Sequence, residues 1–123
     1  MQSARFSRVD SHVLRLEKDR DLLQQLTNYC QENEIDAAHI SVIGAVTEAN
    51  VGFYDQDEEE YEERFIDKPM EIIQASGNVS FLEGERFVHM YATFCQEDGT
   101  VQAGHLFNGT VVFAGEAILH ELE

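Results

Sequence analysis

The sequence predicts an α+β fold, a mainly antiparallel β-sheet of six to seven strands with one long N-terminal helix packed on it. One stretch near the N-terminus has apolar residues at three- and four-residue spacing, which is typical of an amphipathic helix. From about residue 39 onward, apolar and polar residues alternate, as they do in strands. Asp98-Gly99 and Asn108-Gly109 tolerate positive φ and therefore favour hairpin turns between these runs.

The first elements are a strand at residues 12–17, where the pattern alternates, and the helix, from about Arg20 to Asn33. Asp19 or Asp21 can accept a hydrogen bond from the free N–H groups of the first helical turn. We expect the apolar stripe of the helix to cover one face of the sheet. The stripe comprises Leu22, Leu23, Leu26, Tyr29 and Cys30.

The remaining strands alternate along the rest of the chain, with a further candidate at Tyr61–Ile66. The acidic stretch Asp55–Glu63 holds seven carboxylates in nine residues and is interpreted as a solvated loop, with divalent-cation binding as the alternative. No linker or repeat divides the chain, so residues 1–123 are predicted to form a single domain. The expected strands are His39–Val46, Glu48–Asp55, Met70–Phe81, Arg86–Cys95, Val101–Phe107 and Thr110–Leu122.

The balance of charge excludes several classes of partner. Among 123 residues, 24 are Asp or Glu and 8 are Lys or Arg, a formal net charge of −16. Such a surface repels phosphates, which argues against nucleic acid and anionic membranes as direct partners. No apolar run approaches the roughly 20 residues that span a bilayer, and the start lacks the apolar segment of a signal peptide. Cys30 and Cys95 match no metal-binding spacing and are predicted to be free thiols in a reducing cytoplasm.

Chemistry-bearing residues concentrate on the strand at 86–95 and on the next one. Its apolar face, Val88 to Phe94 at every second position, is the natural core face. The opposite face carries His89 and Tyr91, and it fits a ligand pocket or a subunit interface. His105 lies on the next strand, and counting from the Asp-Gly turn indicates that His89 and His105 pair directly only if Gly104 supplies a bulge or offset.

Two imidazoles on one sheet face can hold a divalent transition metal such as zinc. Tyr91, Glu48, Glu71 or water would complete the ligand sphere at His89 and His105. From the residues alone, structural histidines are the favoured interpretation. Glu71 interrupts an apolar strand and lies on the solvent face or against a partner. The other three histidines are predicted to be isolated surface or interface residues; they are His12, His39 and His120.

Several segments, taken in order, resemble the PPC domain (plants and prokaryotes conserved) from about Ser11 to Glu121. The resemblance implies an antiparallel sheet flanked by a helix, a homotrimer formed through the sheets, and a distant fold relationship to acetolactate decarboxylase, a metal enzyme. The segments are Ile40–Val46, Gly52–Asp55, Pro69–Ile73, Ser76–Ser80, Val88–Tyr91 and Gly104–Leu106.

Many family members carry His-x-His and a later Gly-Gly-His, so the resemblance also concerns the metal site. His89 and His105 match the first and last histidines, while Tyr91 replaces the second and Ala103 replaces the first glycine of the pair. Since Tyr is rarely a zinc ligand, this departure counts against tight metal binding. The family's DNA-binding label comes from plant members with a separate AT-hook, and no Arg-Gly-Arg core is present here.

The sequence therefore predicts a cytoplasmic, homotrimeric binding or interaction module without catalysis, whose ligand is a small molecule or a protein. The alternative is a metal-assisted enzyme, or a metal or small-ligand pocket around His89, Tyr91 and His105, with Glu71 as a further ligand-binding candidate. Direct contact with nucleic acid or membrane is not expected.

Overall fold

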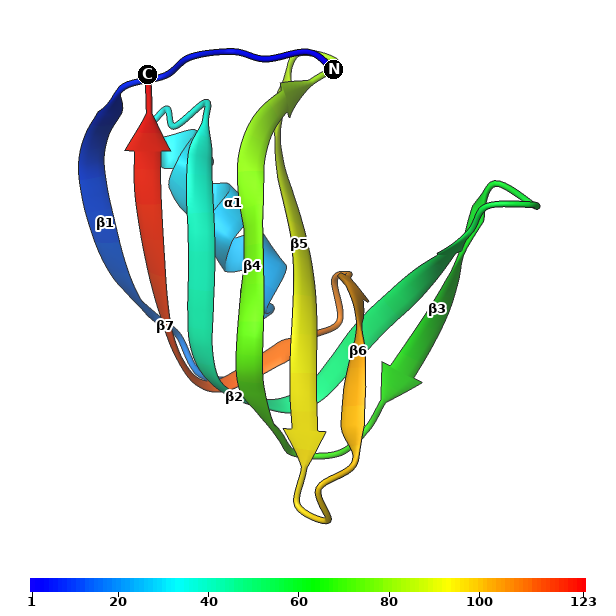
Figure 1. Cartoon of the computed structure of the whole chain (residues 1–123). Coiled ribbons are helices and arrows are strands. Elements are labelled where there is room, and N and C mark those ends of the chain that lie inside the picture. Colours follow the sequence, from blue (N-terminus) through cyan, green and yellow to red (C-terminus); the bar gives the residue numbers. More distant parts are fainter.

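The computed structural model describes the backbone of residues 1–123 and every side chain except that of Leu82. Seven strands and one helix are found in this described chain (Figure 1). In chain order they are β1 (Arg8–Leu16), α1 (Leu22–Glu32), β2 (Ala38–Asp55), β3 (Glu60–Ile66), β4 (Met70–Leu82), β5 (Glu85–Gln96), β6 (Val101–Leu106) and β7 (Val111–Leu122).

All seven strands belong to one antiparallel sheet, as predicted. Its order is β1-β7-β2-β4-β5-β6, with β3 paired to β2 and a further pairing between β2 and β6. The first half of β2 lies between β7 and β4, while its second half pairs with β3 and β6. The β2–β3 hairpin consequently extends from the body of the sheet as an arm (Figure 1).

The two strands predicted at His39–Val46 and Glu48–Asp55 are in fact the single strand β2. Its pairing with β7 shifts register between Val46 and Glu48. Such an irregularity bends a strand without ending it. The bend allows one strand to serve both the body of the sheet and the arm.

The prediction of one long N-terminal helix is wrong. α1 has 11 residues and the chain is mostly sheet. Its N-cap is Asp21, one of the two predicted candidates, whose Oδ1 accepts a hydrogen bond from the Gln24 N–H at 2.8 Å. Before it, the backbone of Arg20 is held by β7, and after the helix Glu34 has a positive φ of 53° that breaks the helical conformation. The helix is therefore confined between two segments that cannot be helical.

α1 covers one face of the sheet, here called the inner face, and lies behind β2 and β4 in Figure 1. Leu22, Leu26 and Cys30 are fully buried on its sheet-facing side. Burial raises the pKa of Cys30 to about 11, so this thiol is an inert core residue. On β5 the four predicted core residues are all buried, which confirms the assignment of its inner face; they are Val88, Met90, Ala92 and Phe94.

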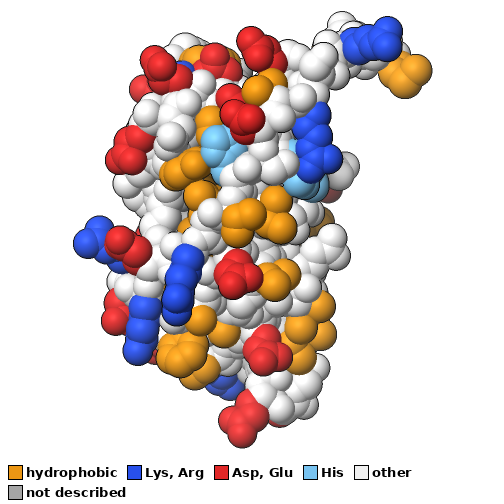
Figure 2. Space-filling model, turned by 90° about the vertical axis from the view of Figure 1, so that its left-hand side faces the viewer, with side chains coloured by type: hydrophobic (Ala, Val, Ile, Leu, Met, Phe, Trp, Pro, Cys, Tyr) orange, Lys and Arg blue, Asp and Glu red, His pale blue; other side chains and the backbone are white. Residues whose placement is uncertain are grey.

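The opposite, outer face of the sheet has no covering helix in the described chain. Large apolar side chains stand exposed on it. They include Val13, Ile43, Ile73, Phe113 and Ile118. Figure 2, which views the molecule from the side of β1, shows exposed apolar side chains in patches among separate carboxylates. No helix among the described residues is long and apolar enough to cross a bilayer.

The acidic stretch is only partly a loop. Asp55 ends β2 and Glu60 begins β3, so residues 56–59 form the turn and the later carboxylates stand on a strand. Asp55 Oδ1 accepts hydrogen bonds from the N–H groups of Asp57 and Glu58 and so closes the turn. Within the described residues, no group of three or more His, Cys, Asp or Glu side chains is arranged to hold a metal ion.

Candidate functional site

Five rings from β3, β5, β6 and the residue directly after β6 meet on the outer face, at the point where the arm leaves the sheet. We call them the histidine–aromatic cluster: His89, Tyr91, His105, Tyr61 and Phe107. The His105 ring is central, with ring centroids 4.9 Å from His89, 5.6 Å from Tyr91, and 4.7 Å from both Tyr61 and Phe107. The structure therefore brings three of the predicted site residues together and adds two aromatic neighbours.

The strand register explains how the two histidines meet. Tyr91, not His89, is the direct cross-strand partner of His105, and the β5–β6 ladder runs without a register shift. The bulge expected at Gly104 is therefore absent from this ladder. His89 lies two residues from Tyr91 on the same face, so it reaches His105 along the diagonal, a distance that long side chains span.

Two glycines position His105 from behind. Gly52 of β2 pairs with His105, and a Cβ on Gly52 would lie 2.3 Å from the Phe107 ring. A Cβ on Gly104 would lie 2.5 Å from the Gly52 carbonyl oxygen. Both positions thus require glycine for the arm and β6 to approach each other. Sequence reasoning missed this role of Gly52, although a glycine inside a strand pattern is a signal of close backbone approach.

The environment of His105 is aromatic, and one of its ring nitrogens has no hydrogen-bond partner among the described residues. The side chain is 8% exposed, and its Nδ1 has no hydrogen-bond partner among the described residues. Burial, reinforced by the nearby His89, lowers the pKa of His105. The ring is therefore neutral at pH 7, which is the form in which imidazole binds metals and accepts hydrogen bonds. Buried polar atoms are normally satisfied, so this Nδ1 is available to accept a hydrogen bond or to bind a metal.

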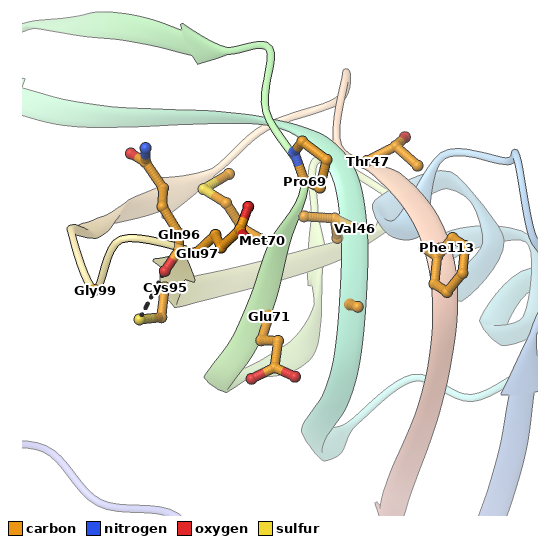
Figure 3. Close-up of a pocket in the computed structure, with 11 residues that line it drawn as sticks. Val46, Thr47, Pro69, Met70, Glu71, Cys95, Gln96, Glu97, Gly99 and Phe113 are labelled. Atoms are coloured by element: carbon orange, nitrogen blue, oxygen red, sulfur yellow. Dashed lines mark hydrogen bonds between the residues drawn. The ribbon is translucent and has the colours of Figure 1, made fainter.

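Glu71, the fourth predicted ligand residue, lies elsewhere. It is exposed and pairs across β4–β5 with Cys95, four residues along β5 from Tyr91. At the usual strand rise this separation is about 13 Å. Glu71 instead lines a separate outer-face pocket of about 690 Å³ together with Cys95, Met70 and Phe113, shown in Figure 3. The prediction that Glu71 joins the histidines is not supported by this geometry.

The pocket in Figure 3 is mainly apolar and has only acids as charged groups. Glu71 and Glu97 are its ionisable carboxylates, and Cys95 contributes a thiol that donates to the Gln96 carbonyl oxygen at 3.4 Å. Its size falls in the range of small-molecule pockets, about 300–1,000 Å³. It lies on the same exposed face as the apolar residues described above.

The sequence predicted that the other three histidines are isolated, but the structure shows that each of them contacts another side chain. His12 contacts both the Tyr29 hydroxyl at 2.8 Å and the Glu121 carboxylate at 3.0 Å. His39 and His120 are cross-strand partners whose rings stack with centroids 6.4 Å apart. Tertiary pairing between β2 and β7 therefore creates a second histidine group at the far side of the outer face.

The sequence profile of the Plants and Prokaryotes Conserved domain, abbreviated PCC or PPC, matches residues 3–123. The chain belongs to this family. The match spans nearly the whole chain, and it agrees with the resemblance carried by the sequence motifs. No curated protein matches the sequence.

Two solved structures are similar to this chain over its full length. A metal-containing protein from Archaeoglobus fulgidus is 39% identical, with a TM-score of 0.95 and 86% of its own chain covered. A plant- and prokaryote-conserved protein from Pyrococcus horikoshii is 32% identical, with a TM-score of 0.95 and 85% of its chain covered.

More distant structures share the fold alone. A protein from Bacteroides thetaiotaomicron, whose name proposes DNA binding, is 24% identical with a TM-score of 0.86, over 94% of this chain and 83% of its own. Acetolactate decarboxylase from Bacillus subtilis is 10% identical with a TM-score of 0.62, and the match covers 94% of this chain and 53% of the enzyme. The distant fold relationship to that enzyme is thereby confirmed.

Proposed function

We propose that this PCC-domain protein is a non-catalytic, homotrimeric binding module of the cytoplasm, which takes its ligand at the histidine–aromatic cluster. The observation that carries the binding site is His105, a nearly buried imidazole whose Nδ1 has no hydrogen-bond partner within the described part of the chain. The assembly is supported separately, by apolar surface that the single chain leaves uncovered. The free state of Cys30 and Cys95 is compatible with a reducing compartment.

The outer face supports the assembly. Ile43 is 58% exposed, Ile73 is 56% exposed and Phe113 is 51% exposed, although all three stand on central strands of the sheet. Large exposed apolar patches on small soluble proteins mark interaction sites. A second and third copy of the same chain would cover this face on each protomer in a closed, symmetric arrangement.

The arm supports the same conclusion. Phe53 is 71% exposed and Phe65 is 55% exposed, on the two strands of the β2–β3 hairpin. A two-stranded hairpin is only marginally stable by itself. Its aromatic side chains would gain burial against a neighbouring copy, and they have no other cover in the described chain.

Direct DNA contact is not proposed, despite the name of the Bacteroides relative. DNA-binding proteins neutralise phosphates with Lys and Arg, whereas this chain has 8 basic residues against 24 acidic ones. A surface with a net charge of −16 repels a polyanion at physiological salt.

Light scattering of the purified protein tests the assembly. We expect a molar mass of about three times the 14.0 kDa of one chain, and a mass near that of one chain would contradict the proposal. Ile43→Glu should dissociate the assembly, because it places a charge on the uncovered outer face. Phe6→Glu is the matched control, since Phe6 is 53% exposed but precedes β1 and lies outside the sheet.

The second candidate is a metal site in the same cluster, which a metal-assisted enzyme would use. The free Nδ1 of His105 and the neighbouring His89 supply two imidazoles, and Tyr91 supplies a phenol in place of a third. The Archaeoglobus relative is a metal-containing protein, which favours this candidate. Zinc held here would act as a Lewis acid toward a bound oxygen ligand.

Elemental analysis of protein purified without chelator separates the two candidates. A metal site predicts near-stoichiometric zinc, iron or manganese that His105→Asn removes. Tyr91→His should raise the zinc affinity, because it restores a third imidazole. Absence of metal from the native protein, together with no gain in the Tyr91→His variant, would contradict the metal site and leave the non-catalytic module.

A further inference from the structure

A second polar group occupies one corner of the outer face, where β1 and β2 begin and β7 ends. We call it the basic corner, and it consists of Arg8, Ser11, His39 and His120. Ser11 and His39 are the cross-strand partners of His120 on its two sides. Strand pairing alone therefore places side chains from three strands beside one another.

The donors of the basic corner converge on His120. The Arg8 guanidinium lies against the His120 Nδ1 and 3.2 Å from the Ser11 hydroxyl oxygen. The Ser11 hydroxyl oxygen is 3.0 Å from the His120 Nδ1. The His39 and His120 rings are stacked, with 7° between their planes. Figure 2 shows a basic side chain against a histidine on the upper part of this side of the molecule.

The charge of this corner is opposite to that of the rest of the chain. Acidic residues outnumber basic ones by 24 to 8, yet no salt bridge to Arg8 is found among the described residues. Partial burial, then the charges of Arg8 and His39, lower the pKa of His120. Three potential cations therefore face one another, and no carboxylate neutralises them within hydrogen-bonding distance in the described structure.

We propose that the basic corner binds a small tetrahedral oxyanion, such as the phosphate group of a metabolite. The guanidinium offers a fork of N–H donors and the hydroxyl adds one donor. Each imidazole donates from one ring nitrogen when neutral and from both when protonated. A bound dianion would relieve the repulsion between Arg8 and the two histidines. The surrounding acidity excludes long polyanions but permits a single small anion. The inference stands apart from the proposed function, because it uses other residues at another part of the outer face.

Titration of the full protein with inorganic phosphate tests this site. The histidine side chains are observed by NMR at pH 6.5 and constant ionic strength. We expect saturable shifts of the His39 and His120 resonances, with His12 and His105 as internal references that do not move. Bound phosphate should also raise the pKa of His120, because an anion favours the protonated ring.

Matched variants make the test specific. Arg8→Gln should weaken phosphate binding about tenfold, the effect of one lost charge-assisted contact. Arg15→Gln removes the same charge from the same strand outside the corner, and it should leave the affinity unchanged. Acetate, a planar anion, should bind more weakly than phosphate.

Three results of the phosphate titration would overturn the proposal. They are the absence of a saturable shift, equal shifts at all histidines, and unchanged phosphate affinity in the Arg8→Gln variant. Binding of a single-stranded oligonucleotide at physiological salt without a response to phosphate would also overturn it, in favour of a nucleic-acid surface. Retained native amide spectra in each variant establish that any loss is local.

Discussion

The two histidine groups of the outer face use the same side chain in opposite surroundings. His105 is 8% exposed and lies among aromatic rings, with the His89 ring 4.9 Å away between centroids. His120 is half-buried beside the permanent cation Arg8 and the hydroxyl of Ser11. Among the side chains that the structure describes, the imidazole of His105 in the first group has a ring nitrogen without a hydrogen-bond partner, and in the second group several donors converge without a carboxylate. Neighbours supplied by other strands, and not the residue type, decide what each histidine can bind.

The largest change in folding stability should come from a substitution that disrupts the backbone packing behind the first histidine group and leaves the second group intact. Gly104→Ala places a Cβ 2.5 Å from the Gly52 carbonyl oxygen, a backbone atom that cannot move aside. We expect a loss of about 3 kcal/mol in the free energy of unfolding, measured by urea denaturation. At Gly115 the nearest atom is the Leu16 side chain at 3.2 Å, so Gly115→Ala should cost about 1 kcal/mol or less. Equal losses in the two variants would show that the contact between arm and β6 does not matter.

The second-largest effect should be a loss of folding stability in acid that depends on His105 in the first group and not on His39 in the second. Because folding lowers the pKa of His105, the unfolded chain takes up its proton first as the pH falls through about 6.5. The contribution of His105 to stability is complete above that pH and is lost below it. His105→Phe should remove this part of the acid sensitivity and leave stability at pH 7 unchanged or slightly higher. Urea unfolding at pH 7.5 and pH 5.5 measures the difference.

The matched variant for this pH test is His39→Gln, in the second group. His39 is exposed, so its replacement should leave the loss of stability between the two pH values as it is in the parent protein. The same pH dependence in the parent and the His105→Phe variant would mean that His105 is not the group responsible.

The smallest change in folding stability is expected for a substitution in the second histidine group. Arg8→Gln removes a cation that lowers the pKa of His120, so this pKa should rise in an NMR titration, while that of His105 should not change. Stability should change by less than about 0.5 kcal/mol, as is usual for a surface substitution. A shift of both histidines would indicate a global effect of net charge and would erase the distinction between the two groups.

Local patterns identified much of the fold and part of the site. Alternation found the strands, the Asp98-Gly99 step found the turn between β5 and β6, and Asp21 was among the expected helix caps. The hairpin predicted at Asn108-Gly109 is wrong, because β6 pairs with β5 and β2 while β7 pairs with β1 and β2. The helix was predicted too long because the tie between Arg20 and β7 is a tertiary contact. Likewise, the sequence predicted two strands in place of β2, because a bulge within a strand and the end of a strand both interrupt the alternation of apolar and polar residues.

What the sequence determined by itself is the family, the antiparallel sheet, the inner face of β5 and the presence of His89, Tyr91 and His105 on one face. These follow from short-range periodicity and from motifs. Only the tertiary structure decided that Glu71 lies apart, that Tyr61 and Phe107 surround His105, and that Arg8 meets His120. Register and the bend of β2 set these neighbours, since they depend on pairings between residues as many as 112 positions apart. The difference between the two histidine groups therefore exists only in the folded chain.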